Sequence, residues 1–353
     1  MRRARRAHRV LRREASQAME MERVLKYDIH GLVRVESNVR PECLAGPLPP
    51  FFITGVGRWG EEADISIFAG DFSYDGTGGI YQEGPLPGPL RSKFLLDGLE
   101  GRARIYFLSP RYRWLGQLKQ EIKDIVLEVL ELKLLQKGHT FIHAACLAGD
   151  SGEAIMLVAP PDTGKTFTTI RLVLEHGLAL MSDDMTILGP GGQAYCFPTP
   201  MTIHPVHVRE LGLRLPRKLM ASARSRWILL STPWVKRAVS ELRLSYRTVL
   251  GDVELVRRAR VERIFFLGRG RRGLRRLDKE EAARKLVPVA KMHRSILDDL
   301  ITIYSYYHPE VDLRGLARRQ DELYDDLLSR VECYAVSAPD RSFADIIVEA
   351  GLI

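Results

Sequence analysis

Residues 154–184 read AIMLVAPPDTGKTFTTIRLVLEHGLALMSDD, and this stretch decides the fold. An apolar run, a turn-like segment, a run with helical spacing, a glycine and a second apolar run follow one another at 154–158, 159–166, 167–176, 177 and 178–181. The adjacent acids Asp183 and Asp184 come just after the second run. The pattern predicts a strand, a loop, a helix that stops at Gly177, and a second strand with an acidic end.

The loop in this stretch has the composition of a phosphate site. Backbone N–H groups at the start of a helix point at one oxyanion, and the helix dipole adds to the attraction. Lys165 is suited to β- and γ-phosphate oxygens, and the Thr166 hydroxyl is suited to magnesium. We therefore predict a site for ATP and Mg²⁺ whose nucleotide-binding residues are Ala159, Pro160, Pro161, Asp162, Thr163, Gly164, Lys165, Thr166 and Phe167.

Four residues of this loop depart from the full phosphate-loop signature. Ala159 stands where the signature has glycine, and Pro160 and Pro161 have no N–H to donate. Asp162 adds a negative charge beside the expected phosphates. Each departure weakens nucleotide binding, so a regulatory module that binds nucleotide without catalysis is the alternative to an enzyme.

The acidic pair and one histidine complete the candidate catalytic set. Two neighbouring carboxylates repel each other unless a cation or a shared proton intervenes. We expect one of them on magnesium and the other as general base toward a hydroxyl group. His143 lies in the apolar segment before the loop strand, from where it could orient Asp183 or tune its pKa. The alternatives are a capped turn for the acids and a core position for the histidine.

Three segments together resemble a known family. They are GHTFIHAA at 138–145, LVAPPDTGKT at 157–166 and LALMSDD at 178–184. This order of a histidine strand, a phosphate loop, a helix and paired aspartates resembles the C-terminal domain of HPr kinase/phosphorylase. That domain shares the phosphoenolpyruvate-carboxykinase-like nucleotide fold.

The resemblance implies an ATP- and Mg²⁺-dependent kinase that phosphorylates a serine-type hydroxyl of a protein, peptide or small molecule. By position, Lys165 matches the phosphate-loop lysine and Asp183 the catalytic acid/base. Thr166 and Asp184 match the magnesium ligands, and His143 matches the histidine that contacts the acids. The chain contains no match to the family's later Gly-rich phosphorylase signature.

The pattern along the chain predicts three regions. Residues 1–21 form an Arg-rich arm, residues 22–113 a β-rich unit, and residues 114–353 the nucleotide-binding kinase domain. The predicted fold class is α/β, with a mixed-sheet P-loop kinase core and a smaller N-terminal β-rich unit. The apolar spacing predicts the main helices at 115–135, 279–286, 295–307 and 313–328. Strands are predicted at 32–36, 51–55, 64–69, 79–82, 103–108, 140–148, 185–188, 194–197, 261–267 and 331–336.

The net charge of +9 is concentrated in two places. Seven arginines lie within residues 2–13, and residues 257–276 hold nine arginines and one acid. Few aromatic residues alternate with these arginines, so nucleic-acid binding is the weakest alternative. Phosphoryl transfer also needs a cation against developing charge, and the candidates are Arg257, Arg258, Arg260, His204 and Arg209.

The composition limits the remaining classes. No apolar run approaches the roughly 20 residues of a membrane span, so we expect no membrane partner. The four cysteines are far apart in the sequence and favour the reducing cytoplasm. A single asparagine and many arginines favour a thermophilic source. The oligomeric state is left open, with a homo-oligomer among the alternatives.

Overall fold

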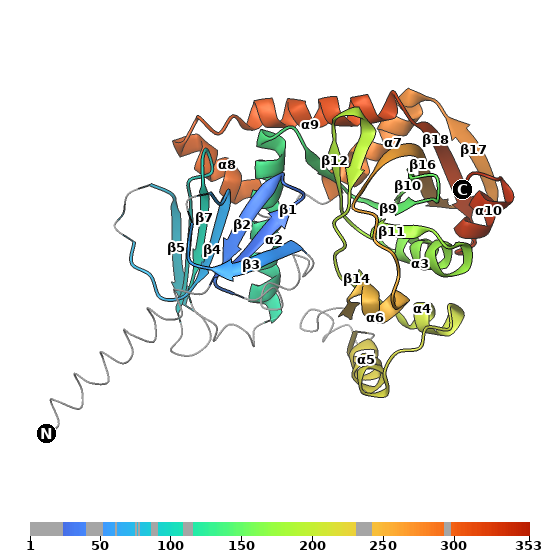
Figure 1. Ribbon diagram of the computed structural model, residues 1–353, viewed down its shortest axis with the longest axis horizontal. Helices are drawn as coiled ribbons and strands as arrows, with labels where there is room; N and C mark the ends of the chain where they lie inside the picture. The colour runs from blue at the N-terminus through green and yellow to red at the C-terminus, as the bar shows by residue number, and fades with distance from the viewer. Residues whose placement is uncertain are drawn as a thin grey trace, which may run out of the picture. The chain divides into compact units, whose positions relative to one another are not determined.

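The computed structural model describes residues 24–39, 52–60, 62–74, 76, 78–85, 91–108, 116–230, 242–292 and 298–353. The predicted arm at 1–21 and Cys43 lie outside the described residues. The chain divides into two compact units (Figure 1). The N-terminal unit is Met1–Lys133 with Leu297–Leu313, and the C-terminal unit is Leu134–Ile296 with Arg314–Ile353.

This division differs from the boundary that the sequence predicts near residue 113. Most of helix α2 (Gly116–Gln136) groups with the N-terminal unit. The reason is Lys133, whose buried ammonium donates to the carbonyls of Leu99 at 2.7 Å and Gly101 at 2.6 Å. Helix α8 (Asp298–Tyr307) joins the same unit because the Tyr304 hydroxyl accepts a hydrogen bond from the Gly98 amide. Both long-range contacts involve residues far apart in sequence.

The N-terminal unit contains a seven-stranded sheet with the order β3-β1-β2-β4-β7-β6-β5. The pairs β2–β4 and β4–β7 are parallel, and the other pairs are antiparallel. The strands are β1 Val24–Ile29, β2 Val33–Ser37, β3 Ile53–Gly57, β4 Ile65–Ala69, β5 Ile80–Pro85, β6 Arg91–Asp97 and β7 Ala103–Phe107. The sequence predicts five of these and misses β1 and β6. In β1 the polar Lys26 and Asp28 alternate with buried residues, and β6 directly follows a Pro/Gly-rich stretch.

The C-terminal unit contains a mixed nine-stranded sheet in which β10, β16 and β18 run parallel. Its strands are β8 Thr140–Ile142, β9 Ala144–Ala148, β10 Glu153–Val158, β11 Ala179–Ser182, β12 Thr186–Gly189, β13 Gln193–Tyr195, β16 Arg258–Arg269, β17 Gly273–Leu277 and β18 Glu332–Ala338. Short strands β14 Met201–Thr202 and β15 Arg243–Leu244 pair separately. The helices are α3 Lys165–His176, α4 Pro205–Glu210, α5 Arg217–Leu230, α6 Tyr246–Leu250, α7 Lys279–Met292, α9 Leu313–Leu328 and α10 Phe343–Glu349, and Pro190–Gly192 is a 3₁₀ turn. The mixed α/β class is therefore confirmed.

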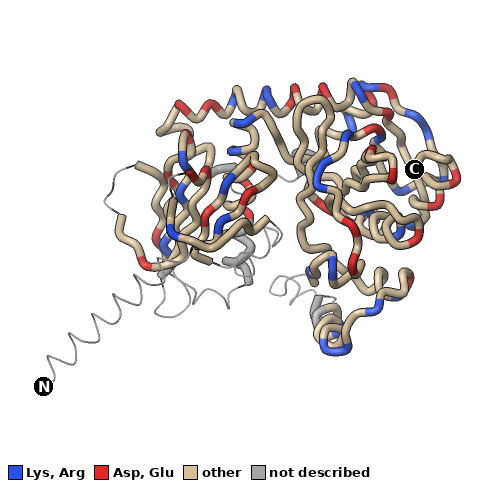
Figure 2. Tube along the Cα trace, in the orientation of Figure 1, with Lys and Arg blue, Asp and Glu red and all other residues tan. Residues whose placement is uncertain are grey.

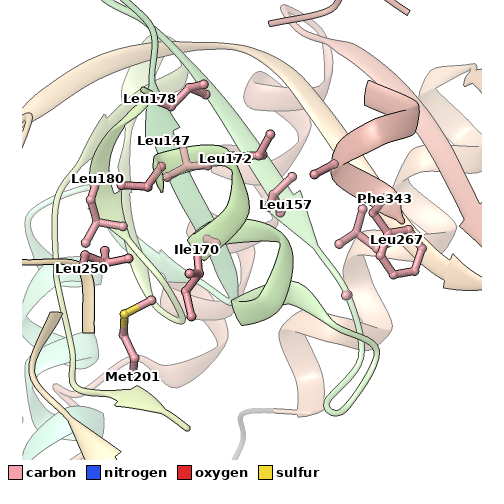
Figure 3. Packing of buried hydrophobic residues seen from close by; sticks show 14 of the residues in the cluster. Leu147, Leu157, Ile170, Leu172, Leu178, Leu180, Met201, Leu250, Leu267 and Phe343 are labelled. Carbon is pink, nitrogen blue, oxygen red and sulfur yellow. The ribbon is translucent and has the colours of Figure 1, made fainter. Parts of the chain in front are cut away.

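The core of the C-terminal unit holds the loop and its helix in place. Figure 3 shows Leu172 of α3 close to Leu157 of β10, Ile170 of α3 in the same apolar cluster, and Leu267 of β16 next to Phe343 of α10. All five side chains are buried. Burial of a residue of this size contributes roughly 1.5–3 kcal/mol each. The start of α3 is thus anchored to the sheet by apolar contacts rather than by the loop itself.

Among the described residues, no helix is both long enough and apolar enough to span a membrane.

Candidate functional site

The loop between β10 and α3 forms where the sequence predicts it. Helix α3 begins at Lys165 and ends before Gly177, which has the left-handed φ of 70° and donates its N–H to the Leu172 carbonyl. The loop itself needs unusual backbone angles, with φ of 60° at Asp162 and 124° at Gly164. Glycine is required at position 164 for its φ, and a Cβ there would lie in van der Waals contact with the Phe343 ring at 3.4 Å.

Lys165 is the buried cation of the site. Its side chain is 9% exposed, and its ammonium lies 3.2 Å from Asp184 Oδ1 and 3.0 Å from His143 Nε2. Both ring nitrogens face this ammonium, which is 3.5 Å from the second one, Nδ1. That nitrogen is 3.4 Å from Asp184 Oδ1. Lys165, His143 and Asp184 therefore form one hydrogen-bonded cluster.

Asp183 forms a second, deeper pair with Thr166. The Thr166 hydroxyl donates to Asp183 Oδ2 at 2.9 Å, and Asp183 is 3% exposed. Burial and then the charge of Asp184 raise the pKa of Asp183 to about 6, although Lys165, Thr166 and Thr169 act in the opposite direction. The second oxygen, Oδ1, is buried and has no hydrogen-bond partner among the described residues.

This unpartnered oxygen tests whether a cation fits the site. Hard divalent cations prefer carboxylate and hydroxyl oxygens, and an isolated buried carboxylate oxygen is costly unless it is paired. Oδ1 of Asp183 and the hydroxyl oxygen of Thr166 are oxygen ligands of this kind. The residues present therefore fit Mg²⁺.

A break in the sheet positions His143. The sequence predicts one strand over 140–148, but the chain changes pairing partner at this residue. Before His143, β8 pairs with β12, and after it β9 pairs with β10 and β11. Because His143 belongs to neither strand, its buried ring reaches Lys165 and Asp184. Its ring contacts Asp184 and Lys165, whereas the sequence argument places it against Asp183.

The other predicted loop residues play different parts. Ala159 and Thr163 are buried, whereas Pro160, Pro161 and Asp162 are exposed. The Thr163 amide donates to the Pro160 carbonyl at 3.4 Å, so this amide is already engaged. Phe167 is also buried, and its ring lies 6.0 Å from the His207 ring. The structure thus gives Phe167 a packing position behind the loop.

The structure separates Arg258 and Arg260, two of the cations that the sequence proposes for transfer, from the loop. Arg260 pairs with Glu153 at the start of β10, while the loop follows Val158, which pairs with Phe266. Six residues of strand span about 20 Å, so Arg260 and the earlier Arg258 lie at the opposite end of the sheet from the loop. Arg257 precedes Arg258 in the sequence. His204 and Arg209 belong to the start and the body of α4, whose His207 ring lies 6.0 Å from the Phe167 ring, and Arg209 pairs with Glu210 at 3.1 Å.

Two arginines that the sequence analysis did not select lie beside the loop. Arg269 Nη2 donates to the Asp162 carbonyl at 3.2 Å, and Cγ of Arg341 lies 3.5 Å from the Cβ position of Gly164. Arg269 ends β16, and Arg341 follows β18. The signal that could have identified them is topological, because parallel strands bring their carboxyl ends to one edge of a sheet.

Acids balance much of the arginine-rich hairpin between β16 and β17. The ion pairs are Arg272–Glu349 at 2.6 Å, Arg275–Glu281 at 2.9 Å and Arg276–Glu332 at 2.9 Å. In Figure 2, basic and acidic segments lie close together around the C-terminus. A nucleic-acid surface needs unpaired cations facing the phosphates. These pairs weaken the nucleic-acid alternative.

Comparison with known proteins adds little to this geometry. No protein-family model matches the chain, and no curated protein matches it. Among solved structures, it is similar to the HPr(Ser) kinase/phosphatase from Coxiella burnetii, with 10% sequence identity and a TM-score of 0.28. The match covers 60% of this chain and 95% of the other. The similarity is distant, and at this TM-score it carries no argument about function.

Proposed function

We propose that the chain is an ATP- and Mg²⁺-dependent kinase that transfers the γ-phosphoryl group to a serine-type hydroxyl. The observation that carries the proposal is the convergence of Lys165, Thr166, Asp183, Asp184 and His143 at the start of α3. An ammonium, a hydroxyl and two carboxylates at a helix N-terminus are the groups that phosphoryl transfer requires. The five residues come from three separate segments of the chain.

Lys165 binds the phosphates in this proposal. Its charge is buried and is shared with Asp184 and His143 before nucleotide binds. A triphosphate above the α3 amides would accept a hydrogen bond from the Lys165 ammonium. The positive charge of the ammonium would stabilise the negative charge that develops during transfer. Lys165 therefore links the nucleotide to the acid beside it.

The contacts favour a division of labour between the acids that reverses the one the family resemblance implies. Asp183 is the buried acid, accepts from Thr166 and has the unpartnered oxygen. We therefore assign Asp183 and Thr166 to Mg²⁺, which when bound would neutralise phosphate charge. Asp184, with a side chain that is 45% exposed, is the acid that an acceptor from solvent can reach.

Asp184 is accordingly the general base. The acceptor oxygen attacks the γ-phosphorus, its proton passes to Asp184, and the bond from the γ-phosphorus to the β–γ bridging oxygen breaks to release ADP. His143, whose Nδ1 lies 3.4 Å from Asp184 Oδ1, holds the carboxylate in position. The Lys165 ammonium pairs with the Asp184 carboxylate at 3.2 Å and helps to fix its position. The acceptor can be a protein, a peptide or a small molecule.

Transfer of label from γ-labelled ATP tests this proposal. Wild type and the variants Lys165→Met, Asp184→Asn and Asp252→Asn are incubated with Mg²⁺ and with serine, serine-containing peptides and a cell extract as acceptors. We expect labelled product from wild type and from Asp252→Asn, an exposed acid outside the site. Asp184→Asn should keep ATP binding but lose transfer by about 100-fold or more. Transfer that Asp184→Asn leaves intact would exclude Asp184 as the base.

A nucleotide-binding regulatory module is the second candidate. The observation in its favour is the loop itself, because Pro160 and Pro161 lack N–H groups and Asp162 is acidic. This candidate expects ATP and ADP to bind in a Lys165-dependent way, with no transfer to any acceptor. A steady rate of product formation by wild type that depends on Asp184 would eliminate it.

A further inference from the structure

The carboxyl ends of three parallel strands meet beside the nucleotide loop. β10 leads into the loop, β16 pairs with β10, and β18 pairs with β16 so that Ala338 lies opposite Arg269. In open α/β sheets, ligands bind at this edge. Arg269 at the end of β16 and Arg341 after β18 both lie beside the nucleotide loop.

Arg269 acts on the loop backbone. Its guanidinium donates to the Asp162 carbonyl at 3.2 Å, the residue whose φ is 60°. A non-glycine residue with positive φ is held by its surroundings, because the conformation is unfavourable by itself. Arg269 is thus a positioning residue that stabilises this turn of the loop.

Arg341 approaches the loop from the segment between β18 and α10. Its Cγ would lie 3.5 Å from a Cβ at Gly164, and its guanidinium carbon is 5.9 Å from the centre of the Phe167 ring. The side chain is 37% exposed, and Nη1 is 3.8 Å from Glu210 Oε2. The guanidinium therefore has solvent access, one weak ionic partner and an aromatic face that restricts its position.

The loop lacks positive character where a nucleotide would need it. Pro160 and Pro161 remove two N–H donors, the Thr163 amide is engaged by the Pro160 carbonyl, and Asp162 is acidic. The amides at the start of α3 and Lys165 remain. A triphosphate carries several negative charges. To bind it as tightly as a loop with the full phosphate-loop signature would, this site needs another cation.

We propose that Arg341 binds the nucleotide phosphates and replaces the donors that Pro160 and Pro161 lack. In the absence of nucleotide Glu210 holds its guanidinium, and the phosphates displace that carboxylate. The assignment rests on the proposed nucleotide site. It extends the phosphate site from the loop to the segment after β18.

Binding titrations with ATP and with inorganic tripolyphosphate test the assignment on the full chain. Arg341→Gln should weaken both ligands by about tenfold or more, as expected for a lost hydrogen bond to a charged group. Arg341→Lys should retain most of the affinity, because it keeps the charge. Arg272→Gln is the matched control, since Arg272 pairs with Glu349 and Ser342, and it should remain within twofold of wild type. Glu210→Gln should bind as tightly as wild type or more tightly.

The outcomes separate the two proposals. If wild type binds neither ligand, or if Lys165→Met binds as wild type does, the nucleotide site is wrong. If wild type binds, Lys165→Met does not, and Arg341→Gln binds like Arg272→Gln, only the role of Arg341 is wrong. A loss for ATP without a loss for tripolyphosphate would place Arg341 on the nucleoside and would also overturn the assignment. Thermal unfolding of each variant confirms that it is folded.

Discussion

Replacing Asp183 with asparagine should stabilise the apo chain while it abolishes phosphoryl transfer. Asp183 is 3% exposed, lies next to Asp184 in the sequence, and has one oxygen without a hydrogen-bond partner in the part of the chain that the structure describes. A buried carboxylate with an unpaired oxygen lowers the stability of the folded chain, but it provides a ligand for a cation. A stability gain that accompanies loss of function is typical of residues kept for function.

The magnitude follows from the pKa of Asp183. Burial and the charge of Asp184 raise this pKa from 3.8 to about 6. One pKa unit corresponds to about 1.4 kcal/mol, so ionised Asp183 lowers the free energy of unfolding by about 3 kcal/mol at pH 7. The asparagine Nδ2 would have no acceptor at the unpartnered position, which costs about 1 kcal/mol. We therefore expect a net gain of about 2 kcal/mol.

The sign of the pH dependence identifies the cause. Between pH 4 and 6 the folded chain binds more protons at Asp183 than the unfolded chain does. The contribution of Asp183 to the free energy of unfolding therefore falls as pH rises through this window. The advantage of Asp183→Asn over wild type should grow from pH 4 to pH 6 and stay constant above pH 6.

The assay is urea unfolding of wild type and variant at pH 4.5 and pH 7.5 with EDTA, followed by hydrogen exchange of the α3 amides. The matched control is Asp184→Asn, which removes the partner of the buried Lys165 ammonium and should destabilise the chain. An equal loss of stability in the two variants, or a pH-independent difference between Asp183→Asn and wild type, would refute the reasoning.

Three further predictions concern the backbone of the loop, a buried histidine and a buried lysine. Gly164→Ala should lower the free energy of unfolding by about 1–3 kcal/mol and abolish ATP binding in a titration. The control is Gly152→Ala, which also has a positive φ but lies outside the loop, and it should leave ATP binding unchanged. His207→Gln should flatten the pH dependence of the free energy of unfolding, measured by urea unfolding. Burial, His204 and Arg341 lower the pKa of His207 from 6.5 to about 4. The free energy of unfolding of wild type therefore decreases by up to about 3 kcal/mol as pH falls from 6.5 to 4. Lys133→Met removes the donor to the carbonyls of Leu99 and Gly101 and should destabilise the N-terminal unit by about 2–4 kcal/mol. Hydrogen exchange of the amides at 98–102 should become faster, and an unchanged exchange rate would contradict this prediction.

Local patterns were sufficient for the elements that carry the loop. The apolar run of β10, the spacing in α3 and the stop at Gly177 depend on neighbours within a few residues, so the sequence predicts them correctly. The same holds for α2 and α9, whose predicted bounds differ from the observed ones by at most one residue. The hairpin of β12 and β13 is confirmed for the same reason.

Long-range pairing explains what the sequence did not predict. The break at His143 exists because β8 pairs with β12 whereas β9 pairs with β10. Small and apolar residues lie on both sides of His143, so the local pattern does not indicate a change of partner. The placement of α2 with the N-terminal unit depends on Lys133 and a loop about 30 residues away. Both are contacts between distant parts of the chain, which periodicity does not encode.

The sequence by itself determined the order of strand, phosphate loop, helix and acidic pair, and with it the chemical groups of the candidate site. Only the tertiary structure decided which acid is buried against Thr166, which acid faces Lys165 and solvent, and which arginines lie beside the loop. The physical reason is that residue type and spacing specify local conformation. Burial, charge pairing and proximity across parallel strands arise only when segments far apart in the sequence pack together.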